Sequence, residues 1–396
     1  MIVSIDDMAV KGKRLVVRAD LNVPMAEGRV TDATRITRFA AGMRRLLDRG
    51  AALVILSHFG RPKGRDKAFS LRHVRDELSR ALVCPVRFAT LDQAADEARR
   101  LNPGQVLLVE NVRHEPGEET NDPALAARFA ELGDIYVNDA FSCAHRAHAS
   151  TDAVARQMPT AAGSLMMEEL AALTAALDAP KRPSVAIVGG AKVSSKIAVL
   201  KHLVTRLDGV IIGGGMANTF LHARGAPMGR SLHEADQTAT VAEIEALAAT
   251  HGCAIHLPVD VVVACEFRAG AAAETLAADR CPGDAMILDA GPESVAAFRE
   301  VMCKARTILW NGPLGVFELP PFDAATMALA RTAADLTRAG LMTSVAGGGD
   351  TVAALNAAGV AGQFTYVSTA GGAFLEWLEG RVLPGVAALD AVEATV

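Results

Sequence analysis

Short apolar runs alternate with longer stretches rich in Ala and Leu along the whole chain. In the first part the runs are RLVVR (14–18), AALVIL (51–56), QVLLVE (105–110) and DIYVN (134–138). In the second part they are SVAIV (184–188), GVII (209–212), AIHLPVDVVV (254–263), AMIL (285–288), TILW (307–310), MTSVA (342–346) and FTYVS (364–368). Strand-like runs separated by helical stretches are typical of βαβ units, so the pattern predicts an α/β protein with parallel sheets.

A different pattern separates the two series of runs. In GSLMMEELAALTAALDAPKRP, apolar residues at positions 166, 170, 173 and 177 fall on one helical face, and Pro180 and Pro183 then end the helix. A chain of 396 residues is also too long for one ordinary core. We therefore predict a first domain over 1–165, an interdomain helix and linker over 166–183, and a second domain over 184–374.

Composition narrows the class of protein. The chain is 51% hydrophobic but only 4% aromatic, which fits parallel strands buried on both faces. No apolar run approaches about 20 residues, and the first residues include acids where a signal peptide would be basic and then apolar. We expect a cytoplasmic protein without membrane contact. Six cysteines without a C-x-x-C pair predict reduced thiols rather than zinc, and a net charge of −5 argues against a nucleic-acid partner.

The residues that follow the runs differ between the two halves. Ligands of open parallel sheets bind beyond the carboxyl ends of the strands. In the first half these places, with the start of the first helix, hold polar and charged residues: Arg18, Asp20, Asn22, Arg35, His58, Arg61, Arg113 and Arg146. One arginine would most often be a surface residue, but several converging guanidinium groups predict a site for a small, strongly anionic molecule.

In the second half the corresponding places hold glycines: 189–190, 213–215, 291, 312, 315, 347–349 and 371–372. Glycine lets a ligand approach the backbone, and free N–H groups at helix starts bind anions, so this half is typical of a nucleotide site. In VAIVGGAKVSSK, Lys192 and Lys196 follow two glycines and are predicted to lie one turn apart on the same helix, although the P-loop spacing is absent. A triple glycine alone is often only a tight turn, so the sorting of residue types by half is the stronger signal.

Nine motifs occur in one order along the chain: RADLNVP, SHFGRP, NDAFSCAHRAHAS, GGAKVSSKI, IIGGGMANTFL, LDAGPES, WNGPLGVFE, GGGDTVAAL and STAGGAFLEWLEG. Together they resemble the phosphoglycerate kinase family along nearly the whole length. The resemblance implies two Rossmann-like, hinge-bending domains joined by a helix, with segment 375–396 packing back on the first domain. It also implies a monomer that transfers a phosphoryl group reversibly between ATP and the carboxylate of 3-phosphoglycerate, giving ADP and 1,3-bisphosphoglycerate, with Mg²⁺.

The resemblance also implies roles for individual residues. The 3-phosphoglycerate site would comprise Asp20, Asn22, Arg35, His58, Arg61, Arg113 and Arg146. The nucleotide site would comprise Gly190, Ala191, Lys192, Lys196, Gly214, Gly215, Leu288, Asn311, Pro313, Gly315, Val316, Glu318, Gly348, Gly349, Asp350 and Thr351. Arg35, Lys192, Gly349 and Gly372 would act on the transferring group, and Asp350 would bind the metal. Three departures from the family pattern are Ala370, Ile287 beside the base pocket and His114 after Arg113.

The chemistry also favours a carboxylate acceptor. A hydroxyl nucleophile usually requires a base, and no Asp or Glu stands out in that role, whereas a carboxylate is already ionised at pH 7. Two alternatives remain. A nicotinamide-dependent dehydrogenase would need G-x-G-x-x-G, but Asn218 and Val352 occupy the last glycine position of the two triplets. A non-catalytic two-lobed anion-binding protein would leave Asp350 and the lysines without a use.

Overall fold

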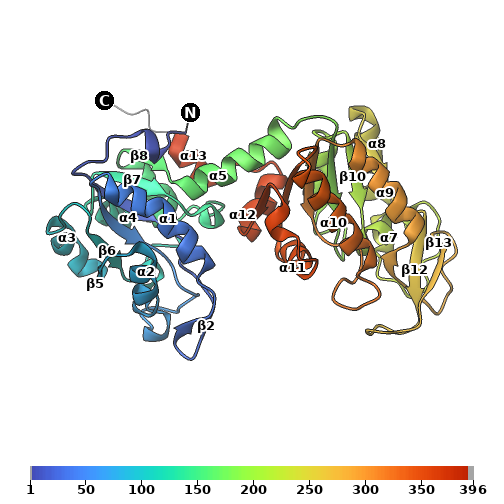
Figure 1. The fold of residues 1–396 in the computed structure, drawn as a ribbon, viewed down its shortest axis with the longest axis horizontal. Helices are drawn as coiled ribbons and strands as arrows, with labels where there is room; N and C mark the ends of the chain where they lie inside the picture. The colour runs from blue at the N-terminus through green and yellow to red at the C-terminus, as the bar shows by residue number, and fades with distance from the viewer. Residues whose placement is uncertain (1, 391–396) are drawn as a thin grey trace. The chain divides into compact units, whose positions relative to one another are not determined.

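The computed structural model describes residues 2–390 and contains two six-stranded parallel sheets, which confirms the predicted α/β class. The described residues divide into two compact units (Figure 1). One comprises the residues up to Leu170 and those from Val382 onward, and the other comprises Ala171–Arg381. Of the predicted C-terminal segment 375–396, residues 382–390 belong to the first unit and 391–396 lie outside the described residues. The domain boundaries predicted from the sequence stay predictions.

The sheet of the first unit has the order β5-β6-β4-β1-β7-β8, with every neighbouring pair parallel. Its strands are β1 (Arg14–Arg18), β4 (Ala52–Leu56), β5 (Val86–Ala89), β6 (Val106–Val109), β7 (Ile135–Asn138) and β8 (Thr160–Ala162). The helices that lie wholly within this unit are α1 (Thr34–Asp48), α2 (Arg75–Leu82), α3 (Leu91–Arg99), α4 (Pro123–Ala130) and α13 (Pro384–Asp390), and β2 (Met25–Ala26) and β3 (Arg29–Val30) form a short hairpin.

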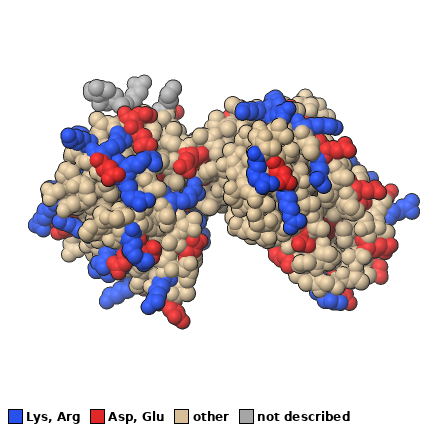
Figure 2. All heavy atoms as spheres, viewed as in Figure 1, with Lys and Arg blue, Asp and Glu red and all other residues tan. Residues whose placement is uncertain are grey.

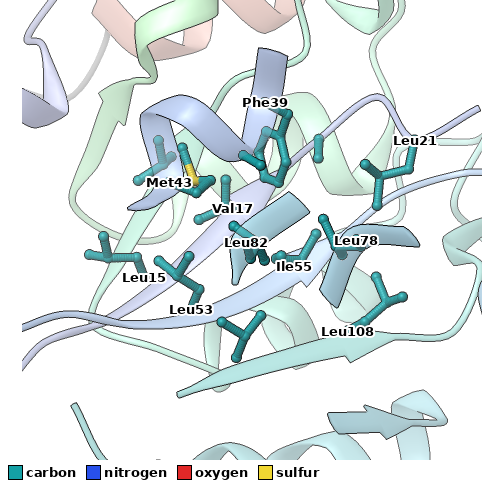
Figure 3. Close-up of a cluster of buried hydrophobic side chains, with 14 of the residues drawn as sticks. Leu15, Val17, Leu21, Phe39, Met43, Leu53, Ile55, Leu78, Leu82 and Leu108 are labelled. Carbon is teal, nitrogen blue, oxygen red and sulfur yellow. The ribbon is translucent and has the colours of Figure 1, made fainter. Parts of the chain in front are cut away.

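Side chains at alternate positions of the central strands face one side of the sheet and form a core there. Figure 3 shows Leu15, Val17, Leu53, Ile55 and Leu108 of the sheet packed with Phe39 and Met43 of α1 and Leu78 and Leu82 of α2. Strand residues of the opposite parity, such as Val16 and Val54, are also fully buried, so both faces of the sheet are covered. Burial of each such aliphatic side chain contributes about 1.5–3 kcal/mol. This burial explains why the strands have continuous apolar runs rather than alternating polarity.

The sheet of the second unit has the order β11-β10-β9-β15-β16-β17. Its strands are β9 (Ser184–Val188), β10 (Gly209–Ile212), β11 (Ala254–His256), β15 (Thr307–Asn311), β16 (Thr343–Gly347) and β17 (Tyr366–Ser368). The helices are α6 (Ile197–Val204), α7 (Gly214–Ala223), α8 (Thr238–His251), α9 (Pro292–Lys304), α10 (Ala324–Arg338), α11 (Gly349–Ala357) and α12 (Gly371–Leu378).

Two sequence predictions about the second unit were wrong in detail. The apolar run 254–263 is not one strand, because Pro258 interrupts it and β12 (Asp260–Ala264) leaves the main sheet. β12 pairs antiparallel with β13 (Glu274–Ala277) and β14 (Met286–Ala290) in a separate three-stranded sheet. The run at 285–288 therefore belongs to an antiparallel strand. A short apolar run does not by itself specify its partner, so the pattern could not distinguish the two sheets.

The helix predicted between the two series of runs is present. α5 covers Ser164–Leu173 and continues as one π-helical turn over Thr174–Asp178. The four apolar residues that defined its predicted face, at positions 166, 170, 173 and 177, are all buried. No helix within residues 2–390 is long and apolar enough to cross a membrane. Basic and acidic side chains are interspersed over the face that Figure 2 shows.

Candidate active site

The strand order of the first unit brings its predicted site residues to one edge of the sheet. β6, β4, β1 and β7 are consecutive and parallel, so the segments that follow them leave from the same edge. Asp20 and Asn22 follow β1, and His58 follows β4. Arg113 lies on a 3₁₀ turn after β6.

Asp20 is the centre of a hydrogen-bond network at this edge. Its Oδ2 accepts hydrogen bonds from Arg35 Nη1 at 2.9 Å and from Ser142 Oγ at 2.6 Å, and its Oδ1 accepts from the Asn22 N–H at 3.1 Å. Burial alone would raise the pKa of Asp20, but the charge of Arg35 and the hydrogen bonds from Ser142 and Asn22 hold it below its usual value. The ionised carboxylate therefore fixes the Arg35 guanidinium, whose Nη1 also donates to Asn22 O at 3.0 Å.

Gly60 connects this network to Arg113. The Gly60 N–H donates to Asn22 Oδ1 at 2.9 Å, and the Gly60 carbonyl accepts from Arg113 Nη1 at 2.6 Å. Gly60 has a φ of +59°, and a Cβ there would lie 2.2 Å from the ring of Phe69, so only glycine fits. Burial lowers the pKa of Arg113, whose Nε lies 3.3 Å from Glu119 Oε1. The loops after three strands are thus held together by one glycine.

The remaining predicted residues of the first unit lie in contrasting surroundings. His58 is 8% exposed, and its Nδ1 lies 3.2 Å from Nη2 of the buried Arg18. Burial first and Arg18 second lower the pKa of His58 to about 3, so the ring is neutral at pH 7. Arg61 is exposed, and so is Arg146, whose Nε donates to His145 Nε2 at 3.2 Å. These two arginines are not part of the Asp20 network.

Sequence reasoning missed some residues of this site. It noted Arg18 but assigned it no role, and it did not single out Ser142 or Glu118, a buried carboxylate that accepts a hydrogen bond from Ser150. Arg18 lies in RADLN and Ser142 in FSCAH, so both motifs contained a signal. His114, expected to alter the surroundings of Arg113, is 6% exposed and lines a separate cavity of about 530 Å³ with Glu110 and Glu115.

The second unit contains a cavity of about 400 Å³ at the edge where its glycine turns lie. Predicted nucleotide residues that line it are Gly190, Ala191, Gly214, Gly215, Leu288, Pro313, Gly315, Val316, Glu318 and Asp350. Lining residues that the prediction did not include are, among others, Asn218, Leu232, Phe267 and Met286. Ile287 also lines the cavity, and its N–H donates to Ser231 Oγ at 2.8 Å. Much of the wall is apolar, as a flat heteroaromatic base requires.

Close backbone contact explains two of the glycines in this cavity. A Cβ on Gly215 would lie 2.4 Å from the carbonyl oxygen of Ala191. Gly214 has a φ of +65°, and a Cβ there would lie 2.9 Å from the oxygen of Gly190. The loop after β9 and the start of α7 therefore touch through main-chain atoms. A ligand in the cavity meets backbone rather than long side chains at this point.

The two lysines of the opening glycine motif differ from the prediction in secondary structure. α6 begins only at Ile197, so Lys192 and Lys196 lie in a turn before the helix and not on it. Lys192 is exposed. Lys196 is partly buried, and its Nζ donates to Gly189 O at 2.6 Å and Asn311 O at 3.2 Å. Burial lowers the pKa of Lys196 to about 8, against the opposing effect of Asp350.

Helix starts supply the remaining predicted groups. α11 begins at Gly349, shortly after β16, and α12 begins at Gly371, shortly after the neighbouring β17. The first N–H groups of a helix have no partner within the helix, so Gly349 and Gly372 can donate to an anion. Ala370, a departure from the family pattern, is buried at the N-cap, and the helix still starts at Gly371.

Asn311 and Thr351 are buried and bind the neighbouring loops. Asn311 Nδ2 donates to Gly347 O at 2.8 Å, and Thr351 Oγ1 accepts from the Gly312 N–H at 2.7 Å. The Thr351 hydroxyl proton is not used in that bond. Gly348, in the motif GGGDT, has a φ of +96° at the N-cap of α11. These contacts fix the loop that presents Asp350.

The surroundings of Asp350 fit a magnesium ion bound with phosphates. Asp350 is exposed in the first turn of α11 and lines the cavity. Mg²⁺ typically takes one or two protein carboxylates and completes its octahedron with phosphate oxygens and water. Within residues 2–390, no three His, Cys, Asp or Glu side chains cluster into a site that could hold a metal by protein ligands alone. A metal at Asp350 would therefore depend on the nucleotide.

Comparisons with known proteins all identify the same family. The family model described as phosphoglycerate kinase matches residues 5–381. The chain is 59% identical to the phosphoglycerate kinase of Dinoroseobacter shibae, covering 98% of this chain and 99% of that protein, and 58% identical to that of Cereibacter sphaeroides strain ATCC 17025, covering 98% and 99%.

Solved structures give the same result. Phosphoglycerate kinase from Coxiella burnetii has a TM-score of 0.93 at 42% identity, covering 98% of this chain and 99% of that one. Phosphoglycerate kinase from Pyrococcus horikoshii OT3 has a TM-score of 0.79 at 29% identity, covering 98% of each chain.

Proposed function

The chain belongs to the phosphoglycerate kinase family, and from this premise we propose which of its residues perform the family's reaction. That reaction is reversible phosphoryl transfer between ATP and a carboxyl group, a step of glycolysis. The family match over residues 5–381 is the observation on which the proposal depends. The contacts within each unit support the individual assignments.

The edge of the first unit would bind 3-phosphoglycerate. Within residues 2–390, Arg35 uses only Nη1 for the chain itself, so Nε and Nη2 can form a fork toward a carboxylate or phosphate. Asp20 and Asn22 hold that fork, and Arg113 is held through Gly60. The exposed Arg61 and Arg146 would close on the ligand's phosphate from solvent. The site would therefore combine rigid arginines with mobile ones.

The cavity of the second unit would bind ATP or ADP. Its apolar wall, including Leu288 and Val316, would hold the base, and Glu318 would accept hydrogen bonds from ribose hydroxyls. Lys196 would bind the phosphates, and their negative charge would stabilise the protonated form that burial disfavours. Asp350 would hold the magnesium ion, which supplies neutralisation of negative charge on the phosphates when it is bound.

Transfer itself requires alignment and charge neutralisation rather than a base. The acceptor carboxylate is ionised at pH 7, so no proton has to be removed. Lys192, Arg35 and the N–H groups of Gly349 and Gly372 would stabilise the transferring group. The two proposed subsites belong to different units. Hinge-bending of these units stays a prediction from the resemblance.

A monomer is also proposed from the resemblance. Light scattering coupled to size-exclusion chromatography tests the oligomeric state.

A coupled assay tests the function. ADP formation should depend on both ATP and 3-phosphoglycerate and on Mg²⁺, and it should be absent with glycerol 3-phosphate, which has no carboxylate. Turnover with glycerol 3-phosphate would point to a hydroxyl acceptor. ATP hydrolysis that does not depend on 3-phosphoglycerate would also contradict the proposal.

A further inference from the structure

Arg18, at the end of β1, is an arginine with almost no contact with solvent. It is 1% exposed, whereas arginine is rarely so buried unless it is fully partnered. Its guanidinium donates in three directions: Nε to Ser150 Oγ at 2.9 Å, Nη1 to Ala19 O, and Nη2 toward His58 Nδ1 at 3.2 Å. The plane of the group is therefore fixed relative to the His58 ring.

A buried carboxylate, Glu118, orients the Ser150 hydroxyl that accepts from Arg18. The Ser150 hydroxyl has one proton, which it donates to Glu118 Oε1 at 2.5 Å, so its oxygen is left to accept from Arg18 Nε. The Ser150 N–H donates to Glu118 Oε2 at 3.0 Å, and Tyr136 Oη donates to Ser150 O at 2.8 Å. Glu118, Ser150 and Arg18 thus form a continuous buried chain that ends at His58.

The direction of these bonds determines the proton on His58. A guanidinium can only donate, so Nδ1 of His58 must accept. The Cys143 thiol, 3.8 Å from Nδ1, is also able to donate. A neutral imidazole that accepts at Nδ1 has its proton on Nε2. Within residues 2–390 Nε2 has no protein partner and is not among the unpaired atoms that are sealed from solvent.

We propose that Arg18 is a positioning residue that holds His58 as the neutral, Nε2-protonated tautomer, so that Nε2–H donates a hydrogen bond to the anionic substrate. The proposal rests on the proposed 3-phosphoglycerate site. The charged and titratable groups that face His58 are Arg18 from β1, Asp20 after it, Arg113 on the turn after β6, Cys143 after β7 and His148. Two of these, Arg18 and Arg113, are cations, and their charge disfavours a second proton on the ring.

Nitrogen NMR on the ¹⁵N-histidine-labelled full chain tests the tautomer directly. His58→Gln identifies the His58 signals among the 10 histidines. Between pH 6 and 8 we expect a protonated Nε2 and an unprotonated Nδ1, without titration. A protonated Nδ1, or a ring that gains charge in this range, would overturn the proposal. This measurement needs no variant of Arg18, so the tautomer can be tested even if such a variant does not fold.

A double-mutant cycle separates positioning from simple loss of charge. Arg18→Met is combined with Glu118→Gln, so that no unpaired carboxylate stays buried. KM for 3-phosphoglycerate should rise about tenfold or more, as for loss of one hydrogen bond to a charged group. In the His58→Gln background the same pair should change KM by less than about twofold. Equal effects in both backgrounds would mean that Arg18 does not act through His58. Ser150→Ala provides a milder variant with the same expected direction.

The KM measurements also distinguish the proposed role of Arg18 from the proposed 3-phosphoglycerate site. If Arg61→Ala and Arg146→Ala leave KM for 3-phosphoglycerate unchanged, the proposed substrate site is wrong. The tautomer result would then stand as a property of the ring alone. If those variants raise KM but the cycle shows no coupling, the site is right and the role of Arg18 is wrong.

Discussion

The two units hold their proposed ligand groups by different means. In the first unit they are side chains, and each is held by a second group: Arg35 by Asp20, Arg113 by Gly60, and His58 by Arg18. In the second unit many are backbone groups at glycine turns and helix starts, where loops touch through main-chain atoms. A side-chain site is sensitive to loss of its supporting partner, and a backbone site to any added Cβ.

The largest effect is expected for Lys192→Ala. Lys192 is exposed and takes no part in the hydrogen bonds that hold Lys196, so we expect it to act on the transferring phosphoryl group. The rate should fall by about 10²-fold or more, with little change in ADP affinity. Single-turnover rates and ADP dissociation constants measure the two quantities. A variant that keeps its rate and loses only affinity would show that Lys192 is an anchor.

The next effect tests the metal. Asp350→Asn should weaken MgADP binding and slow transfer by about 30-fold, because a neutral amide is a poor ligand for Mg²⁺. Titration with Mg²⁺ should require a higher concentration for half-maximal rate. Calorimetry with ADP in EDTA provides the control, since metal-free binding should hardly change. An unchanged magnesium dependence would place the metal elsewhere.

Gly215→Ala tests the backbone nature of the second site. The new Cβ would lie 2.4 Å from the Ala191 oxygen, so the loop must move, and ADP affinity should fall about tenfold. Gly283→Ala is the matched control, because a Cβ there has nothing within 4 Å. The control should bind ADP normally. Equal behaviour of both variants would mean that close main-chain contact is unimportant for the site.

Arg61→Ala and Arg146→Ala test whether the arginines serve one substrate. Each should raise KM for 3-phosphoglycerate about five- to tenfold, as expected for loss of one charge-assisted contact. ADP binding should stay within twofold of the wild-type value. Calorimetry with each ligand separately makes the comparison. Equal losses for both ligands would contradict a division of the substrates between the units.

The smallest effect concerns pH. Lys196 has a pKa of about 8 in the free protein, below its ordinary value because of burial, and nucleotide phosphates favour its charged form. ADP affinity should therefore be full below pH 8 and fall severalfold between pH 8 and 9.5 as the ammonium loses its proton. Lys196→Arg, which stays charged, should flatten this dependence. The same decline in the arginine variant would assign the titration to another group.

Much of the site followed from local sequence because parallel strands present their carboxyl ends at one edge. Asp20, Asn22 and Arg113 could be placed beside one another from the runs that precede them. The lysines show the limit of such reasoning. Their spacing predicted that both lie on one face of a helix. Instead, Lys196 Nζ donates to the carbonyls of Gly189 and Asn311, and the helix starts one residue after Lys196.

The α/β class, the alternation of strands and helices, and the division of arginines and glycines between the halves can all be read from the amino-acid sequence. Burial of both faces of a sheet requires continuous apolar runs, and turns with positive φ favour glycine. The antiparallel partners of β12 and the buried chain from Glu118 through Ser150 to Arg18 depend on the tertiary structure. Those contacts join residues 132 positions apart in the case of Arg18 and Ser150, and no local pattern encodes which distant polar group will complete a buried hydrogen bond.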